Sequence, residues 1–366
     1  MKPVDPFTIS RRSVLKAGAA LSAAALAPTV FARNNRAVSV TLPWLAQGAT
    51  AYMYVAEDQG FFKKRGIDIN IVRGYGSLAA AQNIGNGQFD FGLVSASSTI
   101  LTAANKVPLV ALGTTNYDAY IGILVRADSS IRSPADLEGK KMGGVPAGAE
   151  FPLWKAFAAN ANVDPSKVDI IQADARVLER ALVEKQVDAI MCVASSSYAV
   201  MQGMNAKCRA LLLADHGISF YSNNIVTRPE TLSKEPRLCQ DMTDAILEGL
   251  AFAANDPSAA MGILLKKVPE LALSSGGKEN VRLSQGFMLA SLAAPESIAH
   301  GLGYSDFSRL EAMTDTIMKY VAPSTAIRPN MESLFTNEFV GRVKLNDAQW
   351  AKVKEQNAEF PKLLLG

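Results

Sequence analysis

The sequence predicts an α/β protein with two lobes, each built around a mostly parallel sheet flanked by helices. Strand and helix patterns alternate from residue 37 to residue 113, and the alternation begins again at residue 121. A weak internal echo supports this division, because Gln88-Phe89-Asp90 opens one apolar strand and Gln186-Val187-Asp188 opens another. No Pro/Ser-rich linker separates the halves, so we expect two short hinge crossings, near 114–119 and 220–224, to join them.

The first lobe is expected to contain strands over residues 37–42, 67–72, 89–94 and 107–113. Residues 67–72 read Ile-Asp-Ile-Asn-Ile-Val, a period-two alternation typical of a half-buried strand. Helical patterns over 50–64, 77–84 and 95–105 lie between these strands, and Gly66 and Gly85 mark the ends of two of them. Strands that alternate with helices in this way are usually parallel neighbours in one sheet.

The second lobe is expected to contain strands over 121–126, 141–145, 168–172, 187–193 and 208–213. Its helices are expected over 150–161 and 174–184, with a third around Tyr198. A strand over 224–227 follows, and the chain from residue 229 onward is mostly helical. We therefore divide the chain into a first part of lobe I (33–117), lobe II (118–223), and a return to lobe I with the C-terminal helices (224–366).

The first 32 residues have the features of an export signal. Arg11 and Arg12 precede a short apolar stretch over 14–26, and Val30-Phe31-Ala32 has the small-residue ending of a cleavage site. The stretch is shorter than the ~20 residues that a spanning helix needs. It resembles a twin-arginine (Tat) signal, although an ordinary Sec signal with a chance arginine pair is the alternative. We expect cleavage after Ala32 and a periplasmic mature protein.

The net positive charge of the chain comes entirely from residues 1–32. The formal net charge is +3, and residues 1–32 hold four basic residues and one acidic residue, which leaves 33 of each sign. The mature chain is therefore neutral, and we expect no nucleic-acid partner and no membrane insertion. The cysteines, Cys192, Cys208 and Cys239, are odd in number and lie in predicted elements, which favours buried free thiols over one disulfide.

Motifs of catalysis, metals and cofactors are absent from the sequence. It has no Gly-x-Ser-x-Gly, His-Glu-x-x-His or Cys-x-x-Cys, and only two histidines. The run Gly74-Tyr75-Gly76-Ser77-Leu78-Ala79 fits a dinucleotide-binding pattern, but Val94-Ser95 ends the next strand where an acidic residue should hold a ribose. We interpret the run as a tight turn or a ligand loop, and we predict no catalytic residue, no metal and no cofactor.

Polar and aromatic residues instead gather after the predicted strands, where parallel sheets bind ligands. Each serine there has an alternative role as a helix N-cap, and each aromatic residue has one as core. Arg73 and Arg176 are the basic residues suited to an anionic ligand. The predicted ligand-binding residues are Trp44, Gln47, Arg73, Tyr75, Ser77, Ser95, Ser97, Tyr117, Glu150, Phe151, Ser195, Tyr198 and Asn223.

Three segments carry a family resemblance. Residues 54–69, YVAEDQGFFKKRGIDI, resemble the A-x-x-x-G-F/Y-F-x-x-x-G-L-x-V segment of periplasmic substrate-binding proteins of the nitrate/sulfonate/taurine class of ABC importers, which includes thiamine-pyrimidine-precursor binders. Residues 133–141, SPADLEGKK, resemble the link of that family into its second lobe, and residues 253–260 resemble its helical return. The resemblance covers roughly residues 37–270.

The resemblance implies a bilobal type II binding-protein fold, a monomer that captures a small molecule by hinge closure, and delivery to an ABC permease and its ATPase. It places the ligand loops at Trp44 and Gln47, Tyr75 and Ser77, Ser95 and Ser97, Glu150 and Phe151, and Ser195 and Tyr198. The expected ligand is an organic anion, such as a sulfonate or aromatic carboxylate, or a heterocycle.

The alternative is an exported enzyme or sensor domain on the same fold. Enzymes that resemble the family carry adjacent cysteines with a histidine-rich site, or a nucleophilic cysteine in the loop after the first strand. This chain has no adjacent cysteines, and residues 43–49 contain none. The sequence therefore favours a binding protein that is not an enzyme.

Overall fold

The first of two sheets is built from the N-terminal part of the chain and one returning strand. Its strands are β1 (Arg36–Thr41), β2 (Ile67–Val72), β3 (Phe91–Ser95), β4 (Val110–Thr114) and β10 (Asn223–Thr227), in the order β2-β1-β3-β10-β4. β1 pairs in parallel with β2 and β3, whereas β10 runs antiparallel to both β3 and β4. These observations come from a computed structural model, which describes residues 35–174, 177–274 and 276–365; the predicted signal, 1–32, lies outside that range.

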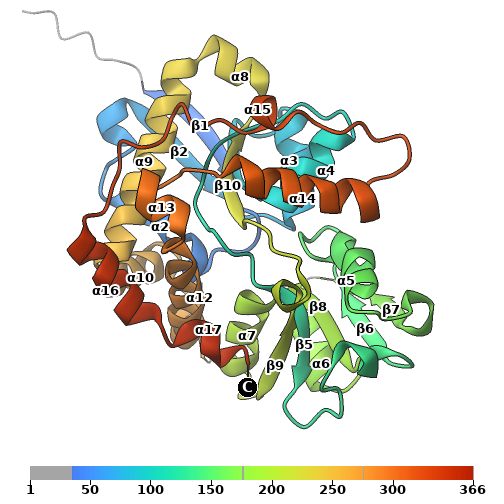
Figure 1. The fold of residues 1–366 in the computed structure, drawn as a ribbon. Helices are drawn as coiled ribbons and strands as arrows, with labels where there is room; N and C mark the ends of the chain where they lie inside the picture. The colour runs from blue at the N-terminus through green and yellow to red at the C-terminus, as the bar shows by residue number, and fades with distance from the viewer. Residues whose placement is uncertain (1–34, 175–176, 275, 366) are drawn as a thin grey trace, which may run out of the picture. The chain divides into compact units, whose positions relative to one another are not determined.

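The second sheet repeats this arrangement with the middle of the chain. It contains β5 (Ile121–Arg126), β6 (Lys141–Gly144), β7 (Asp169–Gln172), β8 (Ala189–Val193) and β9 (Cys208–Leu212), in the order β7-β6-β8-β5-β9. β6 is parallel to β7 and β8, and β5 is antiparallel to β8 and β9. Each sheet is therefore mixed but mostly parallel, as the sequence predicts, and Figure 1 shows both sheets with their flanking helices.

The two antiparallel strands are the ones that enter their sheets from the connections between them. Residues 115–120 lead from β4 to β5, and residues 213–222 lead from β9 to β10. These segments lie side by side, because Ser222 N donates to Asn116 O at 3.0 Å and Ala119 N donates to Phe220 O at 3.0 Å. The rings of Tyr117 and Tyr221 meet edge to face, 5.6 Å apart. Since β5 and β10 start where the other strands end, the carboxyl ends of both sheets face this junction.

Helices cover the two sheets. The first part of the chain contributes α2 (Ala51–Asp58), α3 (Ser77–Gly85) and α4 (Ala96–Ala104), and the middle contributes α5 (Trp154–Asn160), α6 (Leu178–Val183) and α7 (Ala194–Gly203). The remainder forms α8 (Pro229–Lys234), α9 (Pro236–Asn255), α10 (Pro257–Lys267), α11 (Glu270–Leu273), α12 (Gly277–Leu292), α13 (Pro295–His300), α14 (Phe307–Tyr320), α15 (Met331–Leu334), α16 (Asp347–Asn357) and α17 (Phe360–Leu363).

Some helices are shorter than the sequence predicts. The helix expected over 50–64 ends at Asp58, because Gly60 adopts a φ of 70°, which turns the chain out of the helix before a 3-10 turn at Lys63–Arg65. The helix expected over 150–161 starts at Trp154, after a turn that contains Pro152. The helix expected over 174–184 starts at Leu178. In the first two cases the apolar pattern locates the helix, and local turn residues set where it begins or ends.

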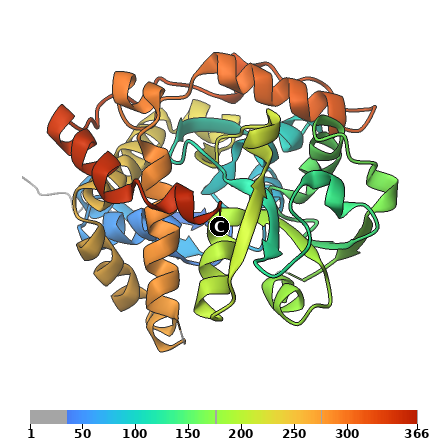
Figure 2. The same cartoon turned by 60° about the horizontal axis from the view of Figure 1, so that its bottom comes forward.

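The C-terminal helices also contact the second sheet. Phe287 of α12 packs against Tyr120 and Tyr198 on one side and against Phe360 of α17 on the other, with centroid distances of 5.8 to 5.9 Å. Ala210 N in the edge strand β9 donates to Leu364 O at 2.8 Å. Figure 2 shows the chain end beside this strand. The segment predicted to return to lobe I therefore supplies β10 to the first sheet and packs against the second as well.

The structure also shows the state of the cysteines and the character of the helices. Cys192, Cys208 and Cys239 are buried free thiols, which confirms the favoured interpretation. Across residues 35–174, 177–274 and 276–365, no helix has the length and apolar character needed to cross a membrane.

Candidate functional site

A cavity lies where the carboxyl ends of the two sheets meet. It encloses about 890 Å³, including the part that is open to solvent. The residues that line it are Pro43, Trp44, Gln47, Ala49, Ser77, Ser95, Asn116, Asp118, Tyr120, Val145, Gly148, Ala149, Glu150, Leu178, Glu179, Cys192, Val193, Ser195, Ser196, Ser197, Ser222, Asn223, Ser284 and Met288. Ligand sites are typically concave and combine apolar walls with a few placed polar groups, and this lining combines Trp44 and Met288 with hydroxyl, amide and carboxyl groups.

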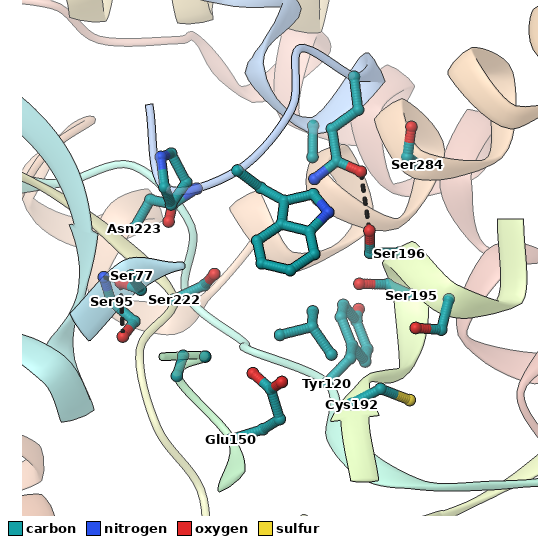
Figure 3. A pocket seen from close by; sticks show the side chains of 18 of the residues that line it. Ser77, Ser95, Tyr120, Glu150, Cys192, Ser195, Ser196, Ser222, Asn223 and Ser284 are labelled. Carbon is teal, nitrogen blue, oxygen red and sulfur yellow. Dashed lines mark hydrogen bonds between the residues drawn. The ribbon is translucent and has the colours of Figure 1, made fainter. Parts of the chain in front are cut away.

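Both sheets and both connections contribute to this cavity. The loop after β1 supplies Trp44 and Gln47, and the loop after β6 supplies Glu150. The first turn of α7 supplies Ser195, Ser196 and Ser197, and the connections supply Asn116, Tyr120 and Ser222. Figure 3 shows the carboxyl group of Glu150 pointing into this space, which Tyr120 and Ser195 also line.

The cavity brings together seven of the thirteen residues predicted from the sequence. Trp44, Gln47, Ser77, Ser95, Glu150, Ser195 and Asn223 line it. Ser196 Oγ donates to Gln47 Oε1 at 2.8 Å, a bond that joins the loop after β1 to α7 across the cavity (dashed in Figure 3). Residues that follow the carboxyl ends of the predicted strands thus come together from both sheets in one cavity.

Ser77 and Ser95 also hold the local backbone. Ser95 Oγ accepts a hydrogen bond from Ser98 N at 3.2 Å, so it caps α4 as the alternative interpretation proposed. Ser77 Oγ donates to Ser95 Oγ at 3.1 Å and accepts from Ser95 N at 2.7 Å. Ser195 is different, because the residue at the N-cap of α7 is Val193 and no side chain caps that helix.

The other predicted residues do not line the cavity. Tyr75 is 66% exposed and its ring lies under Arg73, 4.3 Å from the guanidinium carbon. Tyr117 packs edge to face against Tyr221 in the connections, and Tyr198 packs against Phe287 in the core. Tyr117 and Tyr198 thus pack against other aromatic rings, although their chain neighbours Asn116 and Ser197 line the cavity.

Ser97 and Phe151 complete this group. Ser97 Oγ donates to Ala149 O at 3.1 Å, and it therefore contacts the loop that carries Glu150 instead of the open space. Phe151 follows Glu150 at the start of a short turn, and its ring packs over Gly144, at the end of β6. Arg176, the second basic residue suggested for an anion, lies outside the described residues.

Several lining residues were missed by the sequence reasoning. Asn116 and Asp118 lie in the predicted hinge crossing 114–119, and Ser196 and Ser197 directly follow the predicted Ser195. A wider selection around these positions would have included them. Ser284 and Met288 come from α12, far along the chain in the region where no motif was recognised. No local signal marks them, because their helix reaches the cavity only through tertiary packing.

The cavity is acidic on the side of the second sheet. Burial, with a smaller contribution from the negative charge of the neighbouring Glu179, raises the pKa of the Glu150 carboxyl to about 7. Burial likewise raises the pKa of Glu179, whose Oε1 accepts from Ser197 Oγ at 2.7 Å. Burial also raises the pKa of Asp118, whose Oδ1 accepts from Tyr120 N at 2.8 Å. Among the described lining residues there is no lysine, arginine or histidine.

A metal centre is not formed by these carboxyls. Within the described part of the chain, no three His, Cys, Asp or Glu residues converge in a way that could hold a metal ion. Cys192, which also lines the cavity, is fully enclosed, and burial raises the pKa of its thiol well above its usual value. The arrangement therefore offers hydrogen-bond acceptors, hydroxyls and aromatic walls to a ligand.

Comparison with known proteins identifies the family. A family model described as "NMT1/THI5 like" matches residues 47–260, more than half of the chain. The chain belongs to the NMT1/THI5-like family. The match includes the segments 54–69 and 133–141 on which the resemblance rests, and that resemblance is confirmed at the level of the family.

Relatives of this NMT1/THI5-like chain are mostly named as binding proteins. The riboflavin-binding protein RibY of Chloroflexus aurantiacus is 24% identical over 326 residues, 86% of this chain and 91% of the relative. The formylaminopyrimidine-binding protein of Halalkalibacterium halodurans is 23% identical over 237 residues, 64% of this chain and 71% of the relative. One relative, from Legionella pneumophila, is named as a pyrimidine phosphate synthase.

A solved structure shows that the NMT1/THI5-like chain has the periplasmic binding protein fold. The alkanesulfonate-binding protein SsuA of Xanthomonas axonopodis, solved with MOPS, matches with a TM-score of 0.62 and 13% identity, over 80% of this chain and 96% of SsuA. The α/β fold class expected from the sequence, with two sheets joined by two crossings, is thereby confirmed.

Proposed function

We propose that this chain is the solute-binding component of an ABC importer and that it captures a small organic molecule in the cavity between its two sheets. The observation that carries the proposal is the convergence of side chains from both sheets on one space of about 890 Å³. A ligand there would contact Trp44 and Gln47 on one side and Glu150 and Ser195 on the other. Binding would therefore favour the arrangement in which both sides contact it.

Closure would take place at the two connections. Residues 115–120 and 213–222 carry the chain between the sheets, and their mutual hydrogen bonds make them one double-stranded joint. Short paired segments of this kind allow two halves to rotate while each sheet stays intact. We propose lobe I as residues 33–117 and 224–366, and lobe II as residues 118–223, with this joint as the hinge.

Export and partners complete the proposal. Residues 1–32 would direct the chain through the Tat route to the periplasm, with cleavage after Ala32. There the monomer would deliver its ligand to a permease, which an ATPase drives. The family membership and the naming of most relatives as binding proteins support this assignment.

We further propose that the ligand is bound without turnover. A nucleophile needs a lowered pKa or an adjacent base, and burial keeps the Cys192 thiol protonated. His216 packs edge to face against Phe157 and His300 stacks on Tyr304, and neither histidine lines the cavity. The alternative, an enzyme or sensor on the same fold, has the Legionella relative in its favour.

The test is recovery of the ligand. The mature protein is purified after export, and native mass spectrometry with gentle unfolding identifies the bound small molecule. The compound is then added back to ligand-free protein, titrated by calorimetry, and recovered after prolonged incubation. We expect stoichiometric binding and an unchanged compound. Chemical conversion would establish an enzyme, and failure of any small molecule to bind would reject the binding function.

A further inference from the structure

The charged residues among the described lining of the cavity are all acidic. Glu150 and Glu179 are carboxyls on the side of the second sheet, and Glu179 stands close enough to raise the pKa of Glu150. No described lining residue carries a positive charge. Buried carboxylates are ordinarily paired with a cation or with several donors, since an unpaired buried charge is unfavourable. Here the described protein supplies no such cation.

The acceptors of the cavity have few partners in the protein. Glu179 receives one hydroxyl, from Ser197 at 2.7 Å, and its own backbone N–H. Glu150 receives only the backbone N–H groups of Ala149 and of Glu150 itself. A carboxylate has about four acceptor positions, so most of them remain open toward the cavity. Figure 3 shows the Glu150 oxygens directed into that space.

Asn116 provides an independent observation. Asn116 lines the cavity from the connection between the sheets and is 5% exposed as a residue, and its buried Oδ1 has no hydrogen-bond partner among the described residues. Buried polar atoms are nearly always paired, and an exception calls for a missing partner. A donor placed in the cavity would pair with Asn116 Oδ1. The unpaired acceptor therefore points to the same ligand chemistry as the carboxyls do.

We propose that the ligand is an organic cation, an ammonium or amidinium group attached to a flat apolar ring. Its N–H donors face Glu150 and Asn116, and its ring lies against Trp44. This inference rests on the proposed binding function and names the class of ligand for the same cavity. It also sets this chain apart from binding proteins for sulfonates, because the carboxyls of this cavity repel an anion.

The experiment uses matched probes that differ only in charge. Benzamidinium is compared with benzoate, and tryptamine with indole-3-propionate, by calorimetry and by ligand-detected NMR on the mature protein at pH 8. We expect both cations to bind and to bind at least tenfold more tightly than their anionic counterparts. The ring and size are the same within each pair, so the difference reports the charge that the cavity prefers.

Two variants test whether the Glu150 carboxylate binds the cationic group of the ligand. Glu150→Gln keeps the shape and removes the charge, and it should weaken the cations about 10- to 100-fold, the range expected for hydrogen bonds to charged groups. Gly148→Ala keeps the charge, but a Cβ at Gly148 would overlap the Glu150 carboxyl oxygens, so it should displace the acceptor and weaken the cations as well. Glu355→Gln, on the exposed face of α16, is the matched control and should leave binding unchanged.

The outcomes separate the two proposals. Tight binding of the cations that depends on Glu150 supports the inference. Tighter binding of the anions, or binding of the cations that Glu150→Gln leaves intact, overturns the inference and leaves the binding function standing. Arg176→Gln is then the informative variant, since an anion held by Arg176 would be lost with it. Failure of every probe, together with no ligand recovered from the exported protein, counts against the binding function itself.

Discussion

Ser196 Oγ donates a hydrogen bond to Gln47 Oε1 at 2.8 Å, and the two residues belong to opposite sides of the cavity. Gln47 follows β1 of the first sheet, and Ser196 lies in the first turn of α7, directly after β8 of the second. The bond therefore ties the two halves together at the cavity. It is a contact that rotation about the connections would break.

Ser196→Ala should loosen this contact. A net hydrogen bond is worth about 0.5–1.5 kcal/mol, so the ligand-free protein should shift toward more open arrangements. Small-angle scattering should give a larger radius of gyration for Ser196→Ala than for the wild-type protein. Ser274→Ala, which removes an exposed hydroxyl with only a local bond, is the control. Identical profiles for the two variants would contradict the role assigned to Ser196.

Trp44→Ala should weaken ligand binding by roughly 30-fold or more. The half-buried indole lines the cavity, and a central aromatic contact can contribute ≥2 kcal/mol to binding. Trp350→Ala is the matched control, because Trp350 is buried in the core away from the cavity. It should lower the melting temperature and spare the affinity. Calorimetry and thermal melting of both variants decide the matter, and full affinity in Trp44→Ala would remove Trp44 from the site.

The stability of the protein should fall as the pH rises from about 4.5 to about 7. Glu150 has a pKa of about 7 in the folded protein against an ordinary value of 4.5, so the folded state binds more protons than the unfolded state in this interval. The contribution is about 3 kcal/mol, since each pKa unit corresponds to 1.36 kcal/mol. Glu179 and Asp118, whose pKa values are also raised, add to the same slope.

Glu150→Gln should reduce that slope. The variant and the wild-type protein should have similar free energies of unfolding near pH 4, and the variant should be more stable at pH 8. Urea denaturation at both pH values measures this, with Glu355→Gln as the control for loss of a negative charge. An unchanged pH dependence in Glu150→Gln would mean that Glu150 ionises as freely as it does in water.

Gly286→Ala should destabilise the protein by about 1–3 kcal/mol, the cost of overpacking a core. A Cβ at Gly286 would overlap the ring of Phe360, which packs against Phe287 and holds α17 in place. Gly262→Ala is the matched control, because Gly262 lies inside α10 with no atom near its Cβ direction. It should stabilise the protein by about 0.8–1 kcal/mol through helix propensity. Equal effects of the two substitutions on unfolding would show that α17 does not depend on Gly286.

Replacing Arg11 and Arg12 with lysines should leave the precursor in the cytoplasm. The paired arginines are the feature that distinguishes a Tat signal from a Sec signal of the same length. Cell fractionation and N-terminal sequencing of the mature protein measure the export and the cleavage after Ala32. Unchanged export of the double variant would assign the signal to the Sec route.

The strands and their order along the chain could be predicted because their signals are local. The alternation over 67–72 identified β2 with its observed bounds, and the apolar run over 121–126 did the same for β5. Helix ends were less accurate, as at Asp58, because a glycine turn ended α2 inside a continuing apolar pattern. Trp44 and Glu150 were predicted to face one cleft because they follow parallel strands, whose direction alone decides at which edge of the sheet they end. Both residues line the cavity.

The orientation of individual side chains was decided by tertiary packing. Tyr117 and Tyr198 occupy strand ends, as do Trp44 and Glu150, yet they face Tyr221 and Phe287 because those partners come from segments more than 80 residues away in the chain. Ser284 and Met288 reach the cavity because α12 packs against α7 and against the turn Gly48–Thr50. The acidity of the cavity is also a tertiary property, because burial and the proximity of Glu150 to Glu179 exist only once the loop after β6 and α6 lie together. Periodicity thus determined which elements form, and the packing of distant segments determined which of their side chains meet.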